Sequence, residues 1–100
     1  MVNHPNRKKT ELAVLVTTGR RGVFFGYTDD VSGSSIILRR ARNCIQWRGL
    51  KGFLALSTEG PNSQCRVGPA AATFEAREVT GWAECSPEAI AAWESAPWRK

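Results

Sequence analysis

The sequence predicts an α+β fold: a small antiparallel β-sheet or partial barrel with a short central helix and a C-terminal capping helix. Three features of the 100-residue chain predict it. Short runs rich in β-branched and aromatic residues, separated by glycine-containing turns, occupy the first half. A Ser-Pro-Glu sequence begins the last regular segment, as expected at a helix N-terminus. The length is that of one domain.

The chain is expected to divide into a flexible basic tail, residues 1–10, and a single β-rich domain, residues 11–100. The tail contains Arg7, Lys8 and Lys9 but almost no side chain that a core could bury. Two interpretations stay open: a basic arm that becomes ordered on phosphates, or a solvated tail.

The first element of the domain is predicted to be a β-hairpin. Residues 12–18 and 23–28 are both rich in aliphatic and aromatic side chains, and a Gly-Arg-Arg-Gly turn joins them. This turn would expose Arg20 and Arg21 at its tip. Gly26 interrupts the second run, which predicts a bulge or a close approach of another backbone.

A third strand is predicted at residues 35–42, after a turn rich in serine, aspartate and glycine. Asn43 is expected to mark a bulge or turn, and residues 44–47 then continue the strand or begin a fourth. Residues 51–57 mix helical and alternating spacing of apolar side chains, and they are predicted to form the central helix. A Gly-Pro dipeptide then acts as its stop signal.

The second half is predicted to contain short strands and the capping helix. Residues 65–67 are predicted as a short strand, and residues 73–85 as one or two strands with a break at Gly81. The capping helix is expected at residues 86–96, where a serine N-cap precedes proline and glutamate, and Pro97 ends it.

The cysteines are expected to be reduced and mostly buried, as small apolar side chains. Their number is odd, they lie about 20 residues apart, and no CxxC pair is present. This spacing argues against a disulfide framework and against a zinc site. The three residues are Cys44, Cys65 and Cys85.

Catalytic chemistry is not indicated by the sequence. The single histidine, His4, lies in the tail, so a Ser–His or Cys–His arrangement is not expected. Asp29 and Asp30 are adjacent carboxylates, but they lie in a turn where such residues are usually solvated. No glycine pattern of a phosphate-binding loop occurs. The expectation is a protein without enzymatic activity, cofactor or metal.

Positive charge is concentrated in the first half of the chain. Residues 1–52 contain ten Lys/Arg and three Asp/Glu, a net charge of +7, whereas residues 53–100 contain four and six, a net charge of −2. This asymmetry predicts an acidic partner, either an acidic host protein or nucleic acid or a nucleotide. The alternative is a surface that is basic only for solubility.

The candidate binding residues are those whose planar guanidinium or indole groups suit an acidic partner: Arg20, Arg21, Arg39, Arg40, Arg42, Trp47 and Arg48. Arg39 and Arg40 are neighbours in a predicted strand, so they should point to opposite faces, and one of them should be an ordinary solvent-facing charge.

The tryptophans divide between two expected roles. Trp82 and Trp93 are expected to fill the thin core of a small domain. Trp47 lies within the basic segment of residues 39–51, and it suits either the core or a surface that stacks on bases or forms an interface.

Four structural motifs occur together along the chain: the hairpin around Gly22–Gly26, the Leu-Arg-Arg-Ala-Arg run that continues to Trp47, Leu54-Ala55 with Gly60-Pro61, and the ending from Ser86 to Trp98. As a set they resemble a group of small uncharacterised proteins of tailed bacteriophages and prophages. The resemblance implies a viral origin, and it transfers neither an activity nor site residues.

The leading functional hypothesis is a non-enzymatic phage accessory protein that blocks a host target through a basic face, as a host-takeover or anti-defence inhibitor. The alternatives are binding or sequestration of nucleic acid or nucleotides, and a minor structural role in the virion with self-association as a homo-oligomer. No apolar run approaches the roughly 18 residues of a membrane helix, so a membrane partner is not expected. The expected location is the cytoplasm, that of the bacterial host if the origin is viral.

Overall fold

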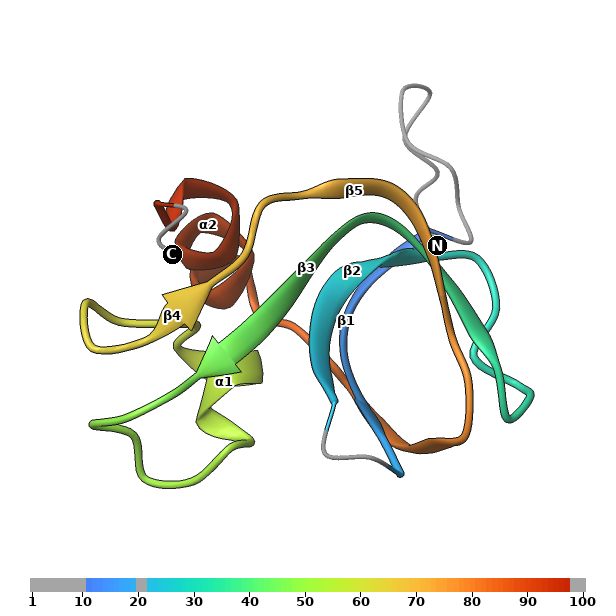
Figure 1. The fold of residues 1–100 in the computed structure, drawn as a ribbon, viewed down its shortest axis with the longest axis horizontal. Helices are drawn as coiled ribbons and strands as arrows, with labels where there is room; N and C mark the ends of the chain where they lie inside the picture. The colour runs from blue at the N-terminus through green and yellow to red at the C-terminus, as the bar shows by residue number, and fades with distance from the viewer. Residues whose placement is uncertain (1–10, 20–21, 98–100) are drawn as a thin grey trace, which may run out of the picture.

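The computed structural model describes residues 11–19 and 22–97, and the tail predicted at residues 1–10 lies outside them. The described residues form an antiparallel β-sheet and two short helices (Figure 1), which confirms the predicted α+β class. In chain order the elements are β1 (Leu12–Thr18), β2 (Val23–Thr28), β3 (Ile36–Gln46), α1 (Ala55–Thr58), β4 (Arg66–Val67), β5 (Ala71–Ala76), β6 (Val79–Glu84) and α2 (Pro87–Ser95).

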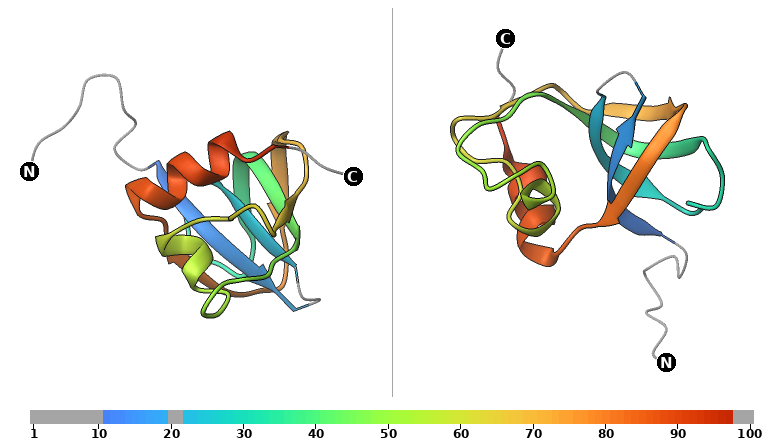
Figure 2. Two further views of the ribbon diagram at one scale, coloured as in Figure 1. Left: turned by 90° about the vertical axis from the view of Figure 1, so that its left-hand side faces the viewer. Right: turned by 90° about the horizontal axis from the view of Figure 1, so that it is seen from below.

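The sheet curls on itself without closing. Its strand order is β4-β3-β2-β1-β6, and β5 pairs with β3 between Ile36 and Ala41. Because only Arg77 and Glu78 separate β5 from β6, the chain passes from the β3 side of the sheet to the β1 side within two residues. Figure 2 shows the resulting curl, in which β5 and β6, within the described residues, do not pair with each other.

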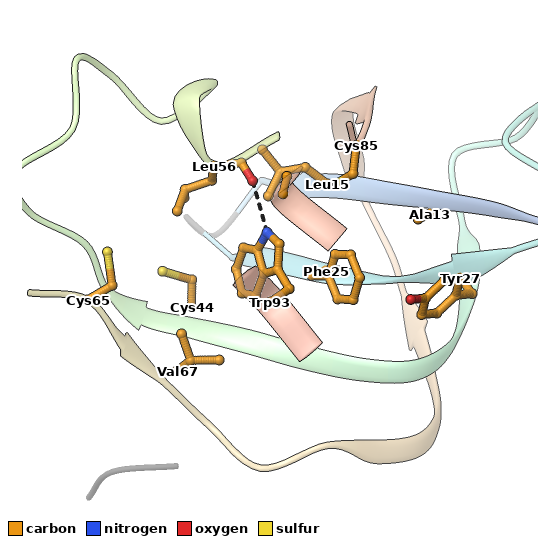
Figure 3. Close-up of a cluster of buried hydrophobic side chains, with 11 residues drawn as sticks. Ala13, Leu15, Phe25, Tyr27, Cys44, Leu56, Cys65, Val67, Cys85 and Trp93 are labelled. Atoms are coloured by element: carbon orange, nitrogen blue, oxygen red, sulfur yellow. Dashed lines mark hydrogen bonds between the residues drawn. The ribbon is translucent and has the colours of Figure 1, made fainter. Parts of the chain in front are cut away.

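The two faces of the sheet are buried by different means. The inside of the curl is filled by side chains from the strands alone, which we call the inner cluster: Val14, Val16, Ile36, Leu38, Ala41 and Ala76. The other face packs against the helices (Figure 3) through the helix-side cluster: Ala13, Leu15, Phe25, Tyr27, Cys44, Leu56, Cys65, Val67, Cys85, Ala89 and Trp93. In β1, Ala13 and Leu15 belong to the helix-side cluster, and Val14 and Val16 belong to the inner cluster. Because both faces of this strand are buried, its apolar run is unbroken.

A β-bulge in β3 decides which of its arginines faces the helices. The register of β2 with β3 leaves Arg40 and Ala41 together opposite one residue, Gly26. Arg40 has a left-handed backbone conformation with φ of 51°. The extra residue shifts the alternation, so that Leu38 and Ala41 both enter the inner cluster and Arg42 turns toward α2.

Gly26 lies where β2 and β3 approach each other most closely. A Cβ on Gly26 would lie 2.8 Å from the Cβ of Leu38, so no side chain fits between the strands. The bulge and the close approach predicted at Gly26 are therefore both confirmed. The bulge expected at Asn43 is wrong, because Asn43 pairs with Phe24 and β3 continues unbroken to Gln46.

Replacing Gly26 with alanine is expected to lower the free energy of unfolding by about 1–3 kcal/mol, because the added methyl group forces the two strands apart. Chemical denaturation measures the change. The matched control is Gly33→Ala in the connection between β2 and β3, where a Cβ would meet nothing closer than 3.8 Å. Equal losses in both variants would contradict the close approach.

The strands of the second half begin and end at places that differ from the predicted ones. The short strand expected at residues 65–67 is present as β4. The break expected at Gly81 is wrong, because the chain breaks at Arg77 and Glu78, and Glu78 has a φ of 55°. Gly81 instead lies within β6, opposite Thr17 of β1.

The helices begin and end at local signals. Turns occupy residues 51–54, so the central helix starts at Ala55, later than predicted. Gly60 follows α1 with a φ of 80°, and a Cβ there would lie 2.5 Å from Ala92, so glycine lets α1 and α2 meet. Ser86 caps α2 as predicted, since its Oγ accepts a backbone hydrogen bond from the first turn. No helix in the described ranges is long and apolar enough to cross a membrane.

Candidate functional site

Two of the predicted binding arginines are paired with carboxylates. Arg39 Nη2 lies 2.8 Å from Glu11 Oε2 and 2.9 Å from Asp29 Oδ1. Arg40 Nη2 lies 3.6 Å from the same Glu11 oxygen, and its guanidinium covers the Tyr27 ring at 4.0 Å. The expectation that Arg39 and Arg40 point to opposite faces is wrong, because the bulge at Arg40 turns both toward Glu11. Much of their charge is therefore compensated within the fold.

Acid is expected to weaken the fold through Glu11. The hydrogen bond from Arg39 lowers the pKa of Glu11 below its usual value of 4.5. A carboxylate with a depressed folded-state pKa stabilises the fold above its unfolded value, and this stability is lost as the pH falls through the folded-state pKa. Because both side chains are partly exposed, the contribution is at most about 1 kcal/mol.

The Glu11→Gln variant should therefore lose less stability than the wild type between about pH 5 and about pH 3. Urea midpoints at the two pH values measure this difference. Glu75→Gln is the matched control, because the only ion pair of Glu75 in the described part is with Arg77, whose side chain is 76% exposed. Parallel pH dependences of the wild type and Glu11→Gln would contradict the contribution of Glu11.

Arg42 lies inside the fold, which corrects its prediction as a binding residue. Its Nε donates to the carbonyl of Gly68 at 2.9 Å, and its Nη1 donates to the carbonyls of Trp93 and Ala96 at 2.7 Å each. The last two carbonyls lie at the C-terminal end of α2, where carbonyl groups lack partners within the helix and the helix dipole is negative. The final turn of α2 contains no basic residue, so Arg42 supplies the positive charge there. Burial lowers the pKa of Arg42, and its charge is held by the helix end and not presented to a partner.

The structure places two of the remaining candidates, Trp47 and Arg48, on a loop. Arg20 and Arg21 lie outside the described residues. Trp47 and Arg48 follow β3 in the loop of residues 47–54, and Arg48 is exposed. The structure thus separates the predicted residues: Arg39 and Arg40 share one carboxylate, Arg42 supports α2, and Trp47 with Arg48 belongs to a different surface.

That surface contains two adjoining concavities between β1, β6 and the loop of residues 47–54. Their volumes are about 110 and about 400 Å³, and the larger lies in the range typical of ligand pockets, about 300–1,000 Å³. Thr17 and Phe53 line both, and no lining residue is charged. We call them together the aromatic groove, with a floor and walls that include Thr17, Val23, Gly81, Trp47, Phe53, Leu54 and Trp82.

The large rings of the aromatic groove are not packed like core residues. Trp47, Phe53 and Trp82 are 38%, 40% and 44% exposed. Within the described residues, none of these rings contacts another aromatic ring, and neither indole N–H donates a hydrogen bond. In contrast, Trp93 is fully buried, its ring stacks on Phe25 with centroids 5.2 Å apart, and its N–H donates to a carbonyl of α1 at 2.9 Å.

The core position predicted for Trp93 is therefore confirmed, and the one predicted for Trp82 is wrong. Among the described strands β6 pairs with β1 alone, so no second neighbouring strand covers the ring of Trp82. Trp47, for which both roles were open, lies at the surface.

The loop of residues 47–54 gives the groove a basic wall. Asn62 Nδ2 donates to the carbonyls of Arg48 and Gly49 at 3.1 and 3.4 Å, which holds the loop in place. Arg48 and Lys51 are exposed, and residues 43–58 contain no aspartate or glutamate. A ligand with negative charge beside its apolar part is therefore electrostatically suited to this wall.

The three cysteine side chains are packed as core residues. All three cysteines are buried, which confirms the burial predicted for them. Burial raises the pKa of Cys44 and of Cys85 to about 12, so both stay protonated near neutral pH. In the part of the chain that the structure describes, no group of three or more His, Cys, Asp or Glu is arranged to hold a metal ion. The groove itself offers apolar contact, ring stacking and threonine hydroxyl groups.

Three residues of the groove were not identified from the sequence. Phe53 and Leu54 lie in a segment assigned to a helix, although the preceding Gly-Leu-Lys-Gly favours a loop that would expose them. Trp82 follows Gly81, and a glycine within a strand is a sign of an edge or a close approach that could have indicated an open side.

Comparison with known proteins places the chain in a family. No curated protein and no solved structure matches it, so the resemblance to phage proteins stays a prediction. The sequence model of one family matches residues 11–93, which include every strand, α1 and most of α2. The chain therefore belongs to the family DUF6948, a domain of unknown function.

Proposed function

We propose that this protein is a binding module that occupies a segment of a partner protein through the aromatic groove. The observation that carries the proposal is the exposure of Trp47, Phe53 and Trp82, which line two adjoining, uncharged concavities. Contiguous exposed apolar surface of this kind is typical of interaction sites, and aromatic residues dominate the binding energy of protein interfaces.

The proposal moves the contact surface away from the arginines of β3. Arg39 is paired with Glu11 and Asp29, Arg40 lies beside the same Glu11, and Arg42 is buried under α2, so the three do not form one exposed basic face. A blocker of a host target, the leading hypothesis from the sequence, would need no chemistry of its own, because covering the surface of its target is sufficient.

The test is affinity capture from bacterial lysate with and without nuclease. The bait proteins are the wild type, the groove variant Phe53→Ser/Trp82→Ser, and the matched control Ile37→Ser, which alters an apolar residue that is 55% exposed outside the groove. The expected result is a protein that survives nuclease treatment and is retained by the wild type and the control, with roughly tenfold less on the groove variant. Capture of no protein, or capture that does not depend on the groove, would contradict the proposal.

A second candidate function is binding of single-stranded nucleic acid. Exposed rings beside Arg48 and Lys51 are the combination on which bases stack while phosphates meet cations. Fluorescence anisotropy of a labelled oligonucleotide at rising salt measures this directly. Phosphate contacts make affinity fall steeply with salt, and a flat response would exclude this function.

A further inference from the structure

We infer that the partner binds as an extended segment that adds a β-strand to the free edge of β6 and places a bulky apolar side chain in the smaller concavity of the aromatic groove. The inference rests on the proposed function, because it specifies how the same groove is filled. It defines the partner by its chemistry: a protein segment with bulky apolar residues at every second position and at least one acidic residue among them.

The first argument is the edge of β6. Among the described strands β6 pairs with β1 alone, because the preceding strand β5 pairs with β3. The register shift of β6 lies at Thr80, and from Gly81 to Glu84 the pairing is regular and the strand contains no proline or lysine. Natural edge strands are usually protected by such residues or by bulges. The N–H of Val79 already donates to the carbonyl of Ser34, so it is the outer N–H and C=O groups of the regular stretch, residues 81–84, that are placed to pair with a strand from another chain.

The second argument is the position of the smaller concavity. Gly81 and Ala83 oppose Thr17 and Leu15, and because both are small, the sheet surface stays open as far as Phe53. In an added strand, a residue opposite Ala83 would have its Cβ about 5 Å from the Cβ of Ala83, on the same face of the sheet. A residue opposite Gly81 would point to that face as well. Its side chain would then enter the concavity of about 110 Å³. A cavity of about 150 Å³ accepts benzene, so this space suits a single aliphatic side chain.

The third argument is the exposure of Trp82, which lies between the two small residues. Its ring is 44% exposed because no described strand continues the sheet beyond β6. An added strand would cover this ring while its own side chains alternate between the two faces of the sheet. The same event would therefore bury Trp82 and fill the concavity.

Charge indicates which segments would be selected. Arg48 and Lys51 are exposed on the loop wall, residues 43–58 contain no aspartate or glutamate, and the whole chain has a net charge of +5. An acidic residue beside Arg48 and Lys51 would complement this wall, whereas one beside the exposed Glu84 of β6 would be repelled. Arg48 and Lys51 lie outside the uncharged lining of the two concavities, so the concavities themselves suit an apolar side chain, and the preference for a protein segment rests on the edge of β6 and not on charge.

The experiment begins with selection of random peptides displayed on a carrier against the full-length wild-type protein. The expected consensus has bulky aliphatic residues at every second position and an acidic residue beside them. The highest-ranking peptide is then synthesised, and its affinity is measured by calorimetry with the wild type, Phe53→Ser/Trp82→Ser and the control Ile37→Ser.

Backbone N-methylation of the peptide tests the strand pairing on the unaltered protein, so no variant has to fold. Methyl groups on one set of alternate amides should lower affinity by roughly tenfold or more, whereas methyl groups on the other set should have little effect, because only every second N–H faces β6. Ala83→Phe, which fills the concavity, should lower affinity to a similar extent, and its urea midpoint reports whether it remains folded.

The outcomes separate the inference from the proposed function. A peptide that depends on Phe53 and Trp82 but shows no alternation in the N-methyl series overturns the added strand and leaves the groove as a binding site. A peptide that binds the groove variant as tightly as the wild type overturns both, as does a selection that yields no peptide while a single-stranded oligonucleotide binds. Alternation together with dependence on the groove supports both.

Discussion

Replacing Arg42 with methionine is expected to lower the free energy of unfolding by about 3–5 kcal/mol, which is a large part of the 5–15 kcal/mol typical of a small domain. The substitution keeps much of the volume but removes the donors to the carbonyls of Gly68, Trp93 and Ala96. Each buried carbonyl left without a partner costs about 1–3 kcal/mol. The C-terminal end of α2, whose last turn has no basic residue, would also lose the positive charge that β3 places beside it.

Urea denaturation of Arg42→Met, Arg42→Lys and Arg77→Ala tests this expectation. The lysine variant keeps the charge but not the planar fork of donors, so an intermediate loss is expected. Arg77 is the matched control, because its side chain is 76% exposed and makes one ion pair, and its removal should cost about 0.5 kcal/mol or less. A loss below about 1 kcal/mol for Arg42→Met would show that water replaces these hydrogen bonds.

Replacing Trp93 with alanine is expected to cost about 3–5 kcal/mol, and more if the cavity cannot collapse. The side chain is fully buried in the helix-side cluster, stacks on Phe25 and donates to the carbonyl of Leu56. Trp93 therefore links α2 to the sheet through Phe25 and to α1 through Leu56. The Trp93→Phe variant fills much of the space but leaves the Leu56 carbonyl unpaired, and about 1–3 kcal/mol of loss is expected for it.

Trp82→Ala is the matched control for Trp93→Ala, because the same number of atoms is removed from a ring that is 44% exposed. Its loss of stability should be about 1 kcal/mol or less, whereas its effect on partner binding should be large. If Trp82→Ala and Trp93→Ala destabilise the protein equally, the division into core and groove tryptophans is wrong. Urea midpoints of the two variants and of the wild type decide this.

Much of the fold could be predicted because its signals are local. The hairpin of β1 and β2 follows from two β-branched runs around a short turn, and α2 follows from the serine cap and the proline at its start. The limits of the other elements were less predictable. α1 and the break before β6 depend on which chain segments meet in space, and glycine patterns alone do not determine that.

The candidate site was much less predictable, as Arg39, Arg40 and Arg42 illustrate. As a sequence they form a basic cluster, and alternation along a strand assigns them to alternating faces. One bulge at Arg40, opposite Gly26, shifts that alternation, pairs two of them with Glu11 and buries the third under α2. A bulge of this kind is set by the register between two strands, which a single strand does not reveal.

The sequence by itself determined the class of the fold, the positions of the hairpin and the capping helix, and the burial of the cysteines, because each depends on composition or on neighbours within a few residues. Only the tertiary structure decided which tryptophans form the core and which arginines remain exposed. The physical reason is that burial and charge compensation depend on contacts between distant segments. Trp82 is exposed because, among the described strands, β6 pairs with β1 alone, whereas Trp93 is buried because α2 packs against the sheet and α1.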